Sequence, residues 1–137
     1  MTMDEWIARY NSKTPEPFKR DERFELYFRP DKGFCEVAQT KDMFIINQLA
    51  GDGRYWKALV DKAARASGIH HCGTWCIREG IRAYIRLFGY HVERIETTED
   101  GRPRYFCRDT EGREAMVSPA FWYRDKNVQA FFVTWEV

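Results

Sequence analysis

The residues best placed for chemistry are two glycines, two positions apart, in the string Gln48-Leu49-Ala50-Gly51-Asp52-Gly53. An apolar run at residues 43–46 precedes the string and predicts a short buried strand, whereas the pattern after it predicts a helix. A glycine-bearing turn from a strand into a helix N-terminus directs free backbone N–H groups and the helix dipole at one spot. The string therefore indicates a phosphate or pyrophosphate site. The alternative interpretation is a tight turn that only lets the strand and the helix pack closely.

The helix after this string follows from the spacing of its apolar residues. Five of them recur at the i, i+3, i+4, i+7, i+8 spacing of a helix with one buried face: Trp56, Leu59, Val60, Ala63 and Ala64. Gly68 is placed to end this helix. Upstream, residues 4–10 predict a short helix, residues 11–21 a loop with two prolines, and residues 24–28 and 34–40 an antiparallel hairpin.

The rest of the chain predicts one more helix among strands. Residues 69–77 are typical of a strand and residues 78–88 of a helix, which Gly89 ends. Further strands are predicted at residues 90–97, 104–108, 115–123 and 130–137, the last two joined by a turn at residues 124–127. This order predicts one α/β domain over residues 1–137, with a mixed, mostly antiparallel central sheet, a parallel strand pair at its centre and flanking helices.

Composition limits the partners that we expect. The 137 residues suit one domain, and 22 basic against 21 acidic residues leave a net charge of +1, so overall charge predicts no nucleic-acid binding. No apolar run has membrane-spanning length, and the N-terminus lacks the pattern of a signal peptide. We therefore expect a cytoplasmic protein without a membrane partner.

Four cysteines are spread over apolar strands: Cys35, Cys72, Cys76 and Cys107. Without a secretory signal, we expect reduced, buried thiols. The run His70-His71-Cys72 with Cys76 invites a zinc interpretation, but on a strand Cys72 and Cys76 lie about 13 Å apart, at about 3.3 Å per residue. Tetrahedral zinc holds each ligand at about 2.3 Å, so the sequence predicts no metal site unless this segment is not a strand.

The glycine string and the order of elements resemble the GNAT family, the Gcn5-related acyl-CoA N-acyltransferases. Residues 48–53 match that family's pyrophosphate motif, R/Q-x-x-G-x-G/A, and Trp56 stands where the family places a large apolar residue three positions later. A second block, Leu87-Phe88-Gly89-Tyr90, resembles the close of the family's next helix on Gly-Phe or Gly-Tyr. The resemblance covers roughly residues 24–92. Short, divergent members of phage and prophage origin resemble the chain further, and residues 74–78 are similar to their T-x-x-R-like strand end, with one residue more between Thr74 and Arg78.

The resemblance implies acetyl-CoA as co-substrate, an unidentified amine as acceptor, and a splayed parallel strand pair that holds the pantetheine. It places the cofactor on residues 46–54: Ile46, Asn47, Gln48, Leu49, Ala50, Gly51, Asp52, Gly53 and Arg54. Arg54 or Lys57 is expected to offset the charge of Asp52 beside the diphosphate. The family's general acid, a tyrosine, is replaced by Ile85 at its usual position, so Tyr84 is the candidate for protonating the leaving thiolate.

Several alternatives stay open at this point. Glu36 and Asp42 are both available as the general base. A catalytically weak or inactive accessory or virion-associated binding protein, made by a bacterium or its phage, is the alternative to an N-acetyltransferase. Finally, aromatic residues occupy both faces of the last two predicted strands, so one face is core and the other is a candidate contact in a homo-oligomer.

Overall fold

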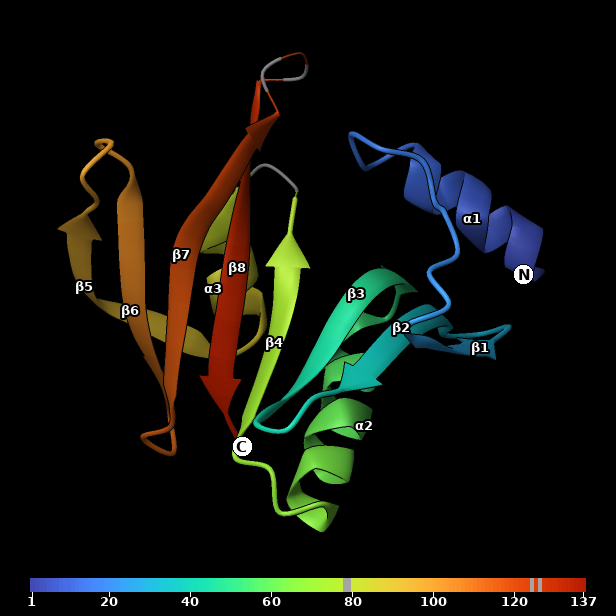
Figure 1. Ribbon diagram of the computed structural model, residues 1–137, viewed down its shortest axis with the longest axis horizontal. Helices are drawn as coiled ribbons and strands as arrows, with labels where there is room; N and C mark the ends of the chain where they lie inside the picture. Colours follow the sequence, from blue (N-terminus) through green and yellow to red (C-terminus); the bar gives the residue numbers. More distant parts are fainter. Residues whose placement is uncertain (78–79, 124, 126) are drawn as a thin grey trace. The chain divides into compact units, whose positions relative to one another are not determined.

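The computed structural model describes residues 1–77, 80–123, 125 and 127–137 and belongs to the α/β class (Figure 1). Its described residues form three helices and eight strands, in a mixed, mostly antiparallel open sheet with one parallel strand pair. The predicted class is therefore confirmed. The chain divides into two compact units, residues 1–72 with Val137 and residues 73–136. That residues 1–137 act as one domain, and that the parallel strands splay apart, stay predictions.

The first unit contains a three-stranded antiparallel sheet and two helices. Its elements are α1 (Met3–Asn11), β1 (Glu25–Arg29), β2 (Gly33–Gln39), β3 (Met43–Gly51), α2 (Gly53–Ala66) and the first residues of β4 (His71–Cys76). β2 pairs with β1 on one side and with β3 on the other. The predicted first helix and hairpin are confirmed, but β3 continues five residues beyond the strand predicted at residues 43–46.

The N-terminal helix covers one face of this sheet. A capping box starts it: the Thr2 hydroxyl accepts from the Glu5 backbone N–H, and the Glu5 carboxylate accepts from the Thr2 backbone N–H. Trp6 and Tyr10 are then buried against Phe34 of β2 and Ala50 of β3. This burial is what orders α1, because a helix of nine residues is marginal on its own.

The second helix follows β3 directly and lies behind β2 and β3 in Figure 1. Trp56, Val60 and Ala64 are buried as predicted, whereas Leu59 is 43% exposed, so the apolar stripe is narrower than the sequence indicates. The Trp56 indole N–H donates to the Lys32 carbonyl oxygen at 2.9 Å. That bond fixes the start of α2 against the β1–β2 turn.

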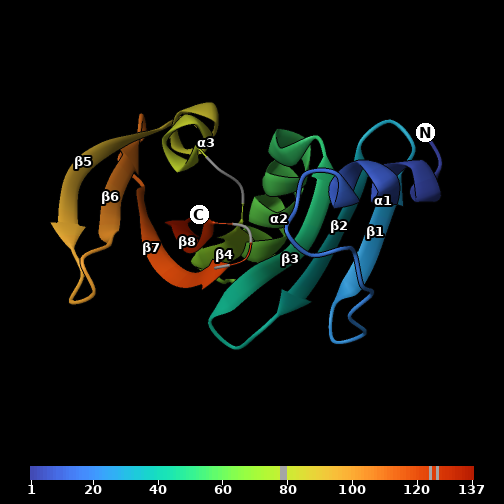
Figure 2. The ribbon, with the colours of Figure 1, turned by 90° about the horizontal axis from the view of Figure 1, so that it is seen from above.

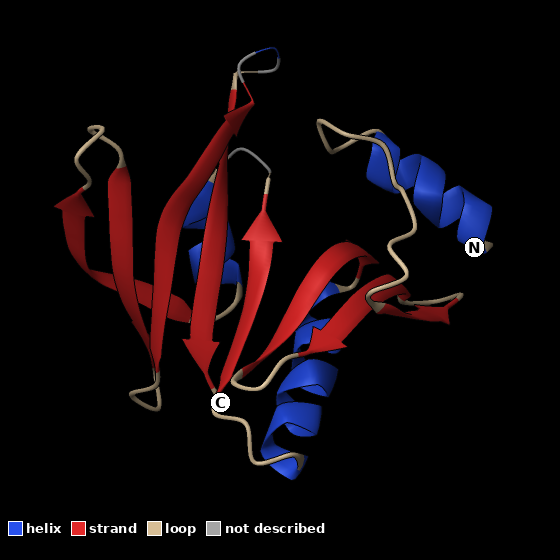
Figure 3. Ribbon diagram, in the orientation of Figure 1, coloured by secondary structure: helices blue, strands red, loops and turns tan. Residues whose placement is uncertain are grey.

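The second unit is mostly strands, with one helix among its described residues (Figure 3). Its elements are the rest of β4, α3 (Ile81–Leu87), β5 (Tyr90–Thr97), β6 (Pro103–Asp109), β7 (Glu114–Tyr123) and β8 (Val128–Glu136). The strand order is β4-β8-β7-β6-β5, so the last strand lies between β4 and β7 (Figure 2). The predicted strand pairs are confirmed. Arg78 and Glu79 of the predicted helix, and Arg124 and Lys126 of the predicted turn, lie outside the described residues.

The strands of the second unit have one buried face and one exposed aromatic face. The buried side chains are Ile85 of α3 with Tyr105, Cys107, Ala115, Val117, Phe131 and Trp135. On the other face, the Trp75 ring lies 4.5 Å from Phe132 and 5.8 Å from Phe121, centroid to centroid. Trp75 is 39% and Phe121 42% exposed. The prediction that both faces carry aromatic bulk is confirmed; coverage of the second face by another copy stays a prediction.

None of the helices in the described part of the chain is long and apolar enough to cross a membrane.

Candidate functional site

The glycine string is only partly a turn. Residues 48–51 belong to β3, and three of them pair with β2, with Leu49 opposite Cys35, Ala50 opposite Phe34 and Gly51 opposite Gly33. Gly51 has φ +101°, and a Cβ there would lie 2.1 Å from the Lys32 carbonyl oxygen. The close approach of the two strands therefore explains this glycine, and the turn itself is reduced to Asp52, because α2 begins at Gly53.

Asp52 caps α2, the helix whose N-terminus is predicted to bind a phosphate group. Its carboxylate Oδ1 accepts from the Tyr55 backbone N–H at 3.0 Å, and its backbone N–H donates to the Lys32 carbonyl at 2.9 Å. The hydrogen bond from Tyr55, with a smaller contribution from Lys32, lowers the pKa of the Asp52 carboxyl group. The chain's own negative charge thus already sits at the N-terminus of α2.

Positive charge reaches this helix end from the β1–β2 turn. The Lys32 ammonium lies 3.4 Å from Asp52 Oδ2, and the Arg29 guanidinium donates to the Tyr55 hydroxyl at 3.0 Å. Both cations also lie over the Tyr55 ring, at 5.6 Å for Arg29 and 5.4 Å for Lys32. Lys57, which the sequence offers as compensation for Asp52, pairs instead with Asp61 at 2.7 Å. The Lys32 ammonium, which the sequence analysis did not name, is therefore placed to offset the charge of Asp52.

A bulge in β3 lies at the start of the same string. Asn47 and Gln48 together oppose the single residue Glu36, so the register shifts there. Glu36 is 0% exposed, and its carboxylate accepts hydrogen bonds from four donors. These are Arg20 Nη1 at 2.7 Å, the Asp21 backbone N–H at 2.9 Å, Asn47 Nδ2 at 3.2 Å and Gln48 Nε2 at 2.5 Å. Four donors saturate the two oxygens, which stabilises the buried charge.

The structure brings neither of the two carboxylates expected as a general base, Glu36 and Asp42, to the end of β3 as a free base. Glu36 has no exposed surface and no spare acceptor position, so it is not placed to take a proton from an amine. Asp42 is exposed at the turn before β3, at the opposite end of that strand from Asp52.

Tyr84, the expected general acid, lies on α3 in the second unit, whereas residues 46–54 lie in the first. Its side chain is half-buried, and the neighbouring Ile85 is 6% exposed. Ile85 thus provides the core contact of this short helix, and the role of Tyr84 stays a prediction.

Three of the four cysteines, Cys35, Cys72 and Cys107, are buried as predicted, whereas Cys76 is only half-buried. No disulfide joins them, and burial raises the pKa of the thiols to about 12 for Cys35 and Cys72 and to about 11 for Cys107. These three thiols are protonated at neutral pH, which makes them poor nucleophiles. Within the described ranges, no three His, Cys, Asp or Glu side chains gather as a metal site would require. Residues 71–76 form a strand, which is the condition under which the sequence predicts no zinc site there.

The Glu36 cluster is the feature that sequence reasoning misses. One signal for it is present, since Glu36 interrupts an otherwise apolar strand of Phe34, Cys35, Val37 and Ala38. A charge at such a position is buried only if it is paired. The identity of the donors is not readable, because Arg20 lies 16 positions before Glu36 and Gln48 lies 12 positions after it.

Comparison of the chain with protein-family models finds no match, and comparison with curated protein sequences finds none either. The GNAT resemblance therefore depends on the residues and the element order described above.

Proposed function

We propose that the protein is an acyl-CoA-dependent N-acyltransferase whose cofactor diphosphate binds at the N-terminus of α2. The observation that carries the proposal is the junction of β3 with a fourteen-residue helix, beside which Arg29 and Lys32 supply positive charge. Helix N-termini with nearby cations are favourable places for phosphate groups. The resemblance to GNAT proteins supplies acetyl-CoA as the cofactor and an amine as the acceptor.

Binding of the cofactor diphosphate at the N-terminus of α2 replaces the Asp52 carboxylate with a phosphate group of the ligand. Asp52 holds the Tyr55 N–H and the Lys32 ammonium, and the proposed diphosphate takes over these donors when the carboxylate turns away. The Asp52 side chain is 43% exposed, so it has room to leave without breaking the core. Gly53, the first residue of α2, adds no side chain at the point of approach.

The proposed chemistry needs a neutral amine that attacks the thioester carbonyl. The carbon–nitrogen bond forms as the carbon–sulfur bond breaks. The amine nitrogen gives its proton to water, and the leaving CoA thiolate takes a proton from the acid, which regains one from water. Backbone N–H groups of the bulged strand polarise the carbonyl, and Tyr84 is the residue that we propose as the acid. Its reference pKa near 10 keeps a tyrosine protonated at neutral pH.

Titration calorimetry with acetyl-CoA tests the binding step. The parent is expected to bind saturably, and Lys32→Glu is expected to weaken binding by about tenfold or more, because a cation beside the phosphates becomes an anion. Lys62→Glu is the matched control, since it makes the same charge change at an exposed position further along α2. Equal losses for both variants would point to overall charge, and no binding by the parent at millimolar acetyl-CoA would refute the proposal.

Thiol release with a panel of amines tests the chemical step. Weak turnover is expected for the parent, and Tyr84→Phe should slow it by about 10²–10⁴-fold, the usual worth of a general acid. Tyr27→Phe, on exposed β1, is the control for loss of a phenol. A Tyr84→Phe protein as active as the parent would exclude Tyr84 as the acid.

The second candidate function is a binding protein without turnover on the same scaffold. The capping of α2 by Asp52 favours it, because a helix end that is already neutralised has less to gain from a ligand anion. Saturable acetyl-CoA binding with no thiol release across the panel would support this candidate over the enzyme.

A further inference from the structure

The loop between α1 and β1 is fastened to the sheet at two points. Its residues 18–24, here called the strap, begin with Phe18, whose ring lies 5.0 Å from Phe34 and 6.1 Å from Tyr10, centroid to centroid. The Phe18 backbone N–H donates to Asn11 Oδ1 at 2.7 Å. An apolar anchor thus holds the first residue of the strap in the core beneath α1.

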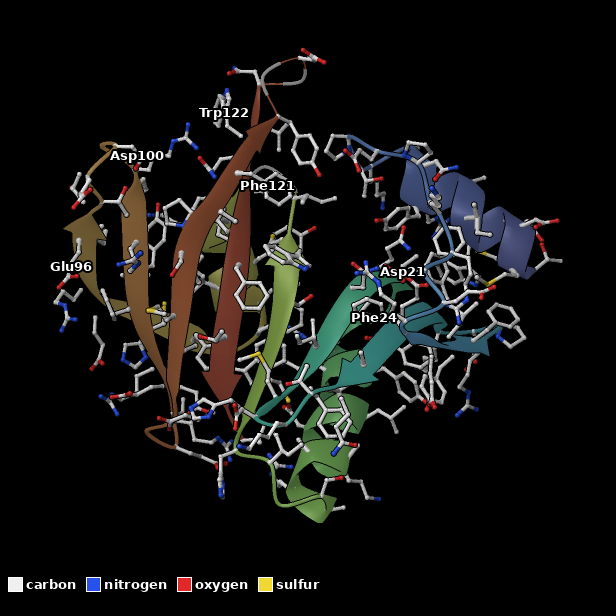
Figure 4. The ribbon with its side chains drawn as sticks, viewed as in Figure 1. Asp21, Phe24, Glu96, Asp100, Phe121 and Trp122 are labelled. Atoms are coloured by element: carbon white, nitrogen blue, oxygen red, sulfur yellow. The ribbon has the colours of Figure 1, made fainter. Side chains whose placement is uncertain are left out.

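The second fastening is polar and involves three consecutive strap residues. The Lys19 backbone N–H donates to Gln48 Oε1 at 3.2 Å, and Gln48 Nε2 donates to the Lys19 carbonyl at 2.6 Å. Arg20 and the Asp21 backbone N–H both bond to Glu36. Asp21 and Phe24 mark where the strap passes beside β2 and β3 (Figure 4).

Gln48 has a distinct place in this arrangement. Its side-chain amide donates to Glu36 and to the Lys19 carbonyl while its oxygen accepts from the Lys19 N–H, so the whole amide group is engaged. Asn47, its neighbour in the bulge, has Glu36 as its partner and contacts the sheet side of the cluster. The bulge therefore presents one amide to the strap and one to the sheet.

We propose that Gln48 and Glu36 form a latch that closes the strap over the bulge of β3, and that Gln48 serves this latch and not a ligand. This inference goes beyond the proposed function and does not depend on it. Gln48, the first residue of the Gln-x-x-Gly-x-Gly string, thereby holds the strap in place. Its side-chain amide pairs with the backbone N–H and carbonyl of Lys19, as the backbone of a neighbouring strand would. The closed strap supplies two of the four donors of the buried Glu36 carboxylate, and the loss of these donors inside the protein disfavours opening.

Hydrogen exchange at single amides tests the latch. In Gln48→Ala, exchange of the Lys19 N–H should rise about tenfold or more relative to the parent, since its acceptor is gone. In the matched control Asn47→Ala, which also removes one donor from Glu36, exchange of the same amide should rise clearly less than in Gln48→Ala, because the lost bond does not involve the strap backbone. Gln48→Met keeps the side-chain volume and replaces Gln48→Ala if the alanine variant does not fold.

Two results would overturn the latch. One is a Lys19 exchange rate that rises equally in both variants, which marks a general loss of stability. The other is an acetyl-CoA affinity that falls about tenfold in Gln48→Ala while Lys19 exchange stays at the parent rate, which assigns Gln48 to the ligand. Failure of the parent to bind acetyl-CoA counts against the proposed function alone, because the exchange measurement uses no ligand.

Discussion

Two carboxylates, Glu36 and Asp52, lie beside the second half of β3, and their negative charges are stabilised in opposite ways. Glu36, at the bulge, is 0% exposed and has four donors, including the Arg20 guanidinium. Asp52, at the end of the strand, has a side chain that is 43% exposed, and it accepts from Tyr55 and pairs with Lys32. Burial makes the first carboxylate depend on every partner, whereas water can replace the partners of the second.

The comparison of Glu36 with Asp52 indicates where a ligand anion can displace a carboxylate from its hydrogen-bond donors. Removing a donor from Glu36 leaves an uncompensated charge in the interior, so this site resists exchange. Asp52 can rotate into water and leave its helix N–H groups to another anion at little cost. The polar residues nearest the start of the glycine string are therefore structural, and those at its end are available for binding.

The largest effect that separates the two carboxylates is expected from Glu36→Leu. Removing the acceptor leaves the Arg20, Asp21, Asn47 and Gln48 donors without their partner. Urea unfolding should show a loss of about 3–5 kcal/mol, the usual cost of breaking a buried ion pair. Glu25→Leu, on the neighbouring strand β1, is the control, because Glu25 is exposed and its replacement should cost little. Equal losses for the two variants would contradict the structural role of Glu36.

A smaller effect is expected where the strand ends, at Gly51. Its φ of +101° and the 2.1 Å approach of a Cβ to the Lys32 oxygen make Gly51→Ala costly, by about 2–4 kcal/mol from backbone strain and overpacking together. Gly68→Ala is matched to it, because Gly68 has φ +71° but nothing within 4 Å of a Cβ. Its cost should be about 1–2 kcal/mol, from the left-handed conformation alone.

Urea midpoints compare these two variants directly. A Gly68→Ala protein as destabilised as Gly51→Ala would show that steric contact at Gly51 contributes nothing. The comparison also shows that substitution of Gly51 is a poor test of ligand binding, because any side chain there disturbs the pairing of β2 with β3.

The sequence predicted most elements because their signals are local. The apolar stripe of α2, the β1–β2 hairpin and the order of the later strands each follow from spacing within a few residues. The end of β3 did not follow, because Asn47 and Gln48 are polar and their pattern predicts that the buried strand ends at residue 46. They are part of it because Glu36 gives their amides a partner inside the protein.

The candidate site was predictable only in part, for a similar reason. The helix end after Gly51 was located correctly, and the Lys57–Asp61 pair at i, i+4 could have been read from spacing. Lys32, the cation that contacts Asp52, comes from 20 residues earlier and depends on how β2 pairs with β3. Pairing across strands decides which charges meet, and the local spacing of residues does not show how β2 and β3 pair.

The smallest expected effect is the pH dependence of the exposed carboxylate. Hydrogen bonding to the Tyr55 N–H, and then to Lys32, lowers the pKa of the Asp52 carboxyl group below its ordinary value in the folded protein. A lowered folded-state pKa means that the carboxylate adds stability above the unfolded-state pKa, near 3.9, and that this contribution is lost as the pH falls through the folded-state pKa. The difference in urea midpoint between the parent and Asp52→Asn should therefore be constant from pH 7 to about 5 and shrink below about 4. Lys32→Met should keep most of this pH dependence, because Tyr55 provides the largest contribution. A difference that persists unchanged to pH 3 would mean that Asp52 caps α2 equally well without its charge, and would remove the contrast with Glu36.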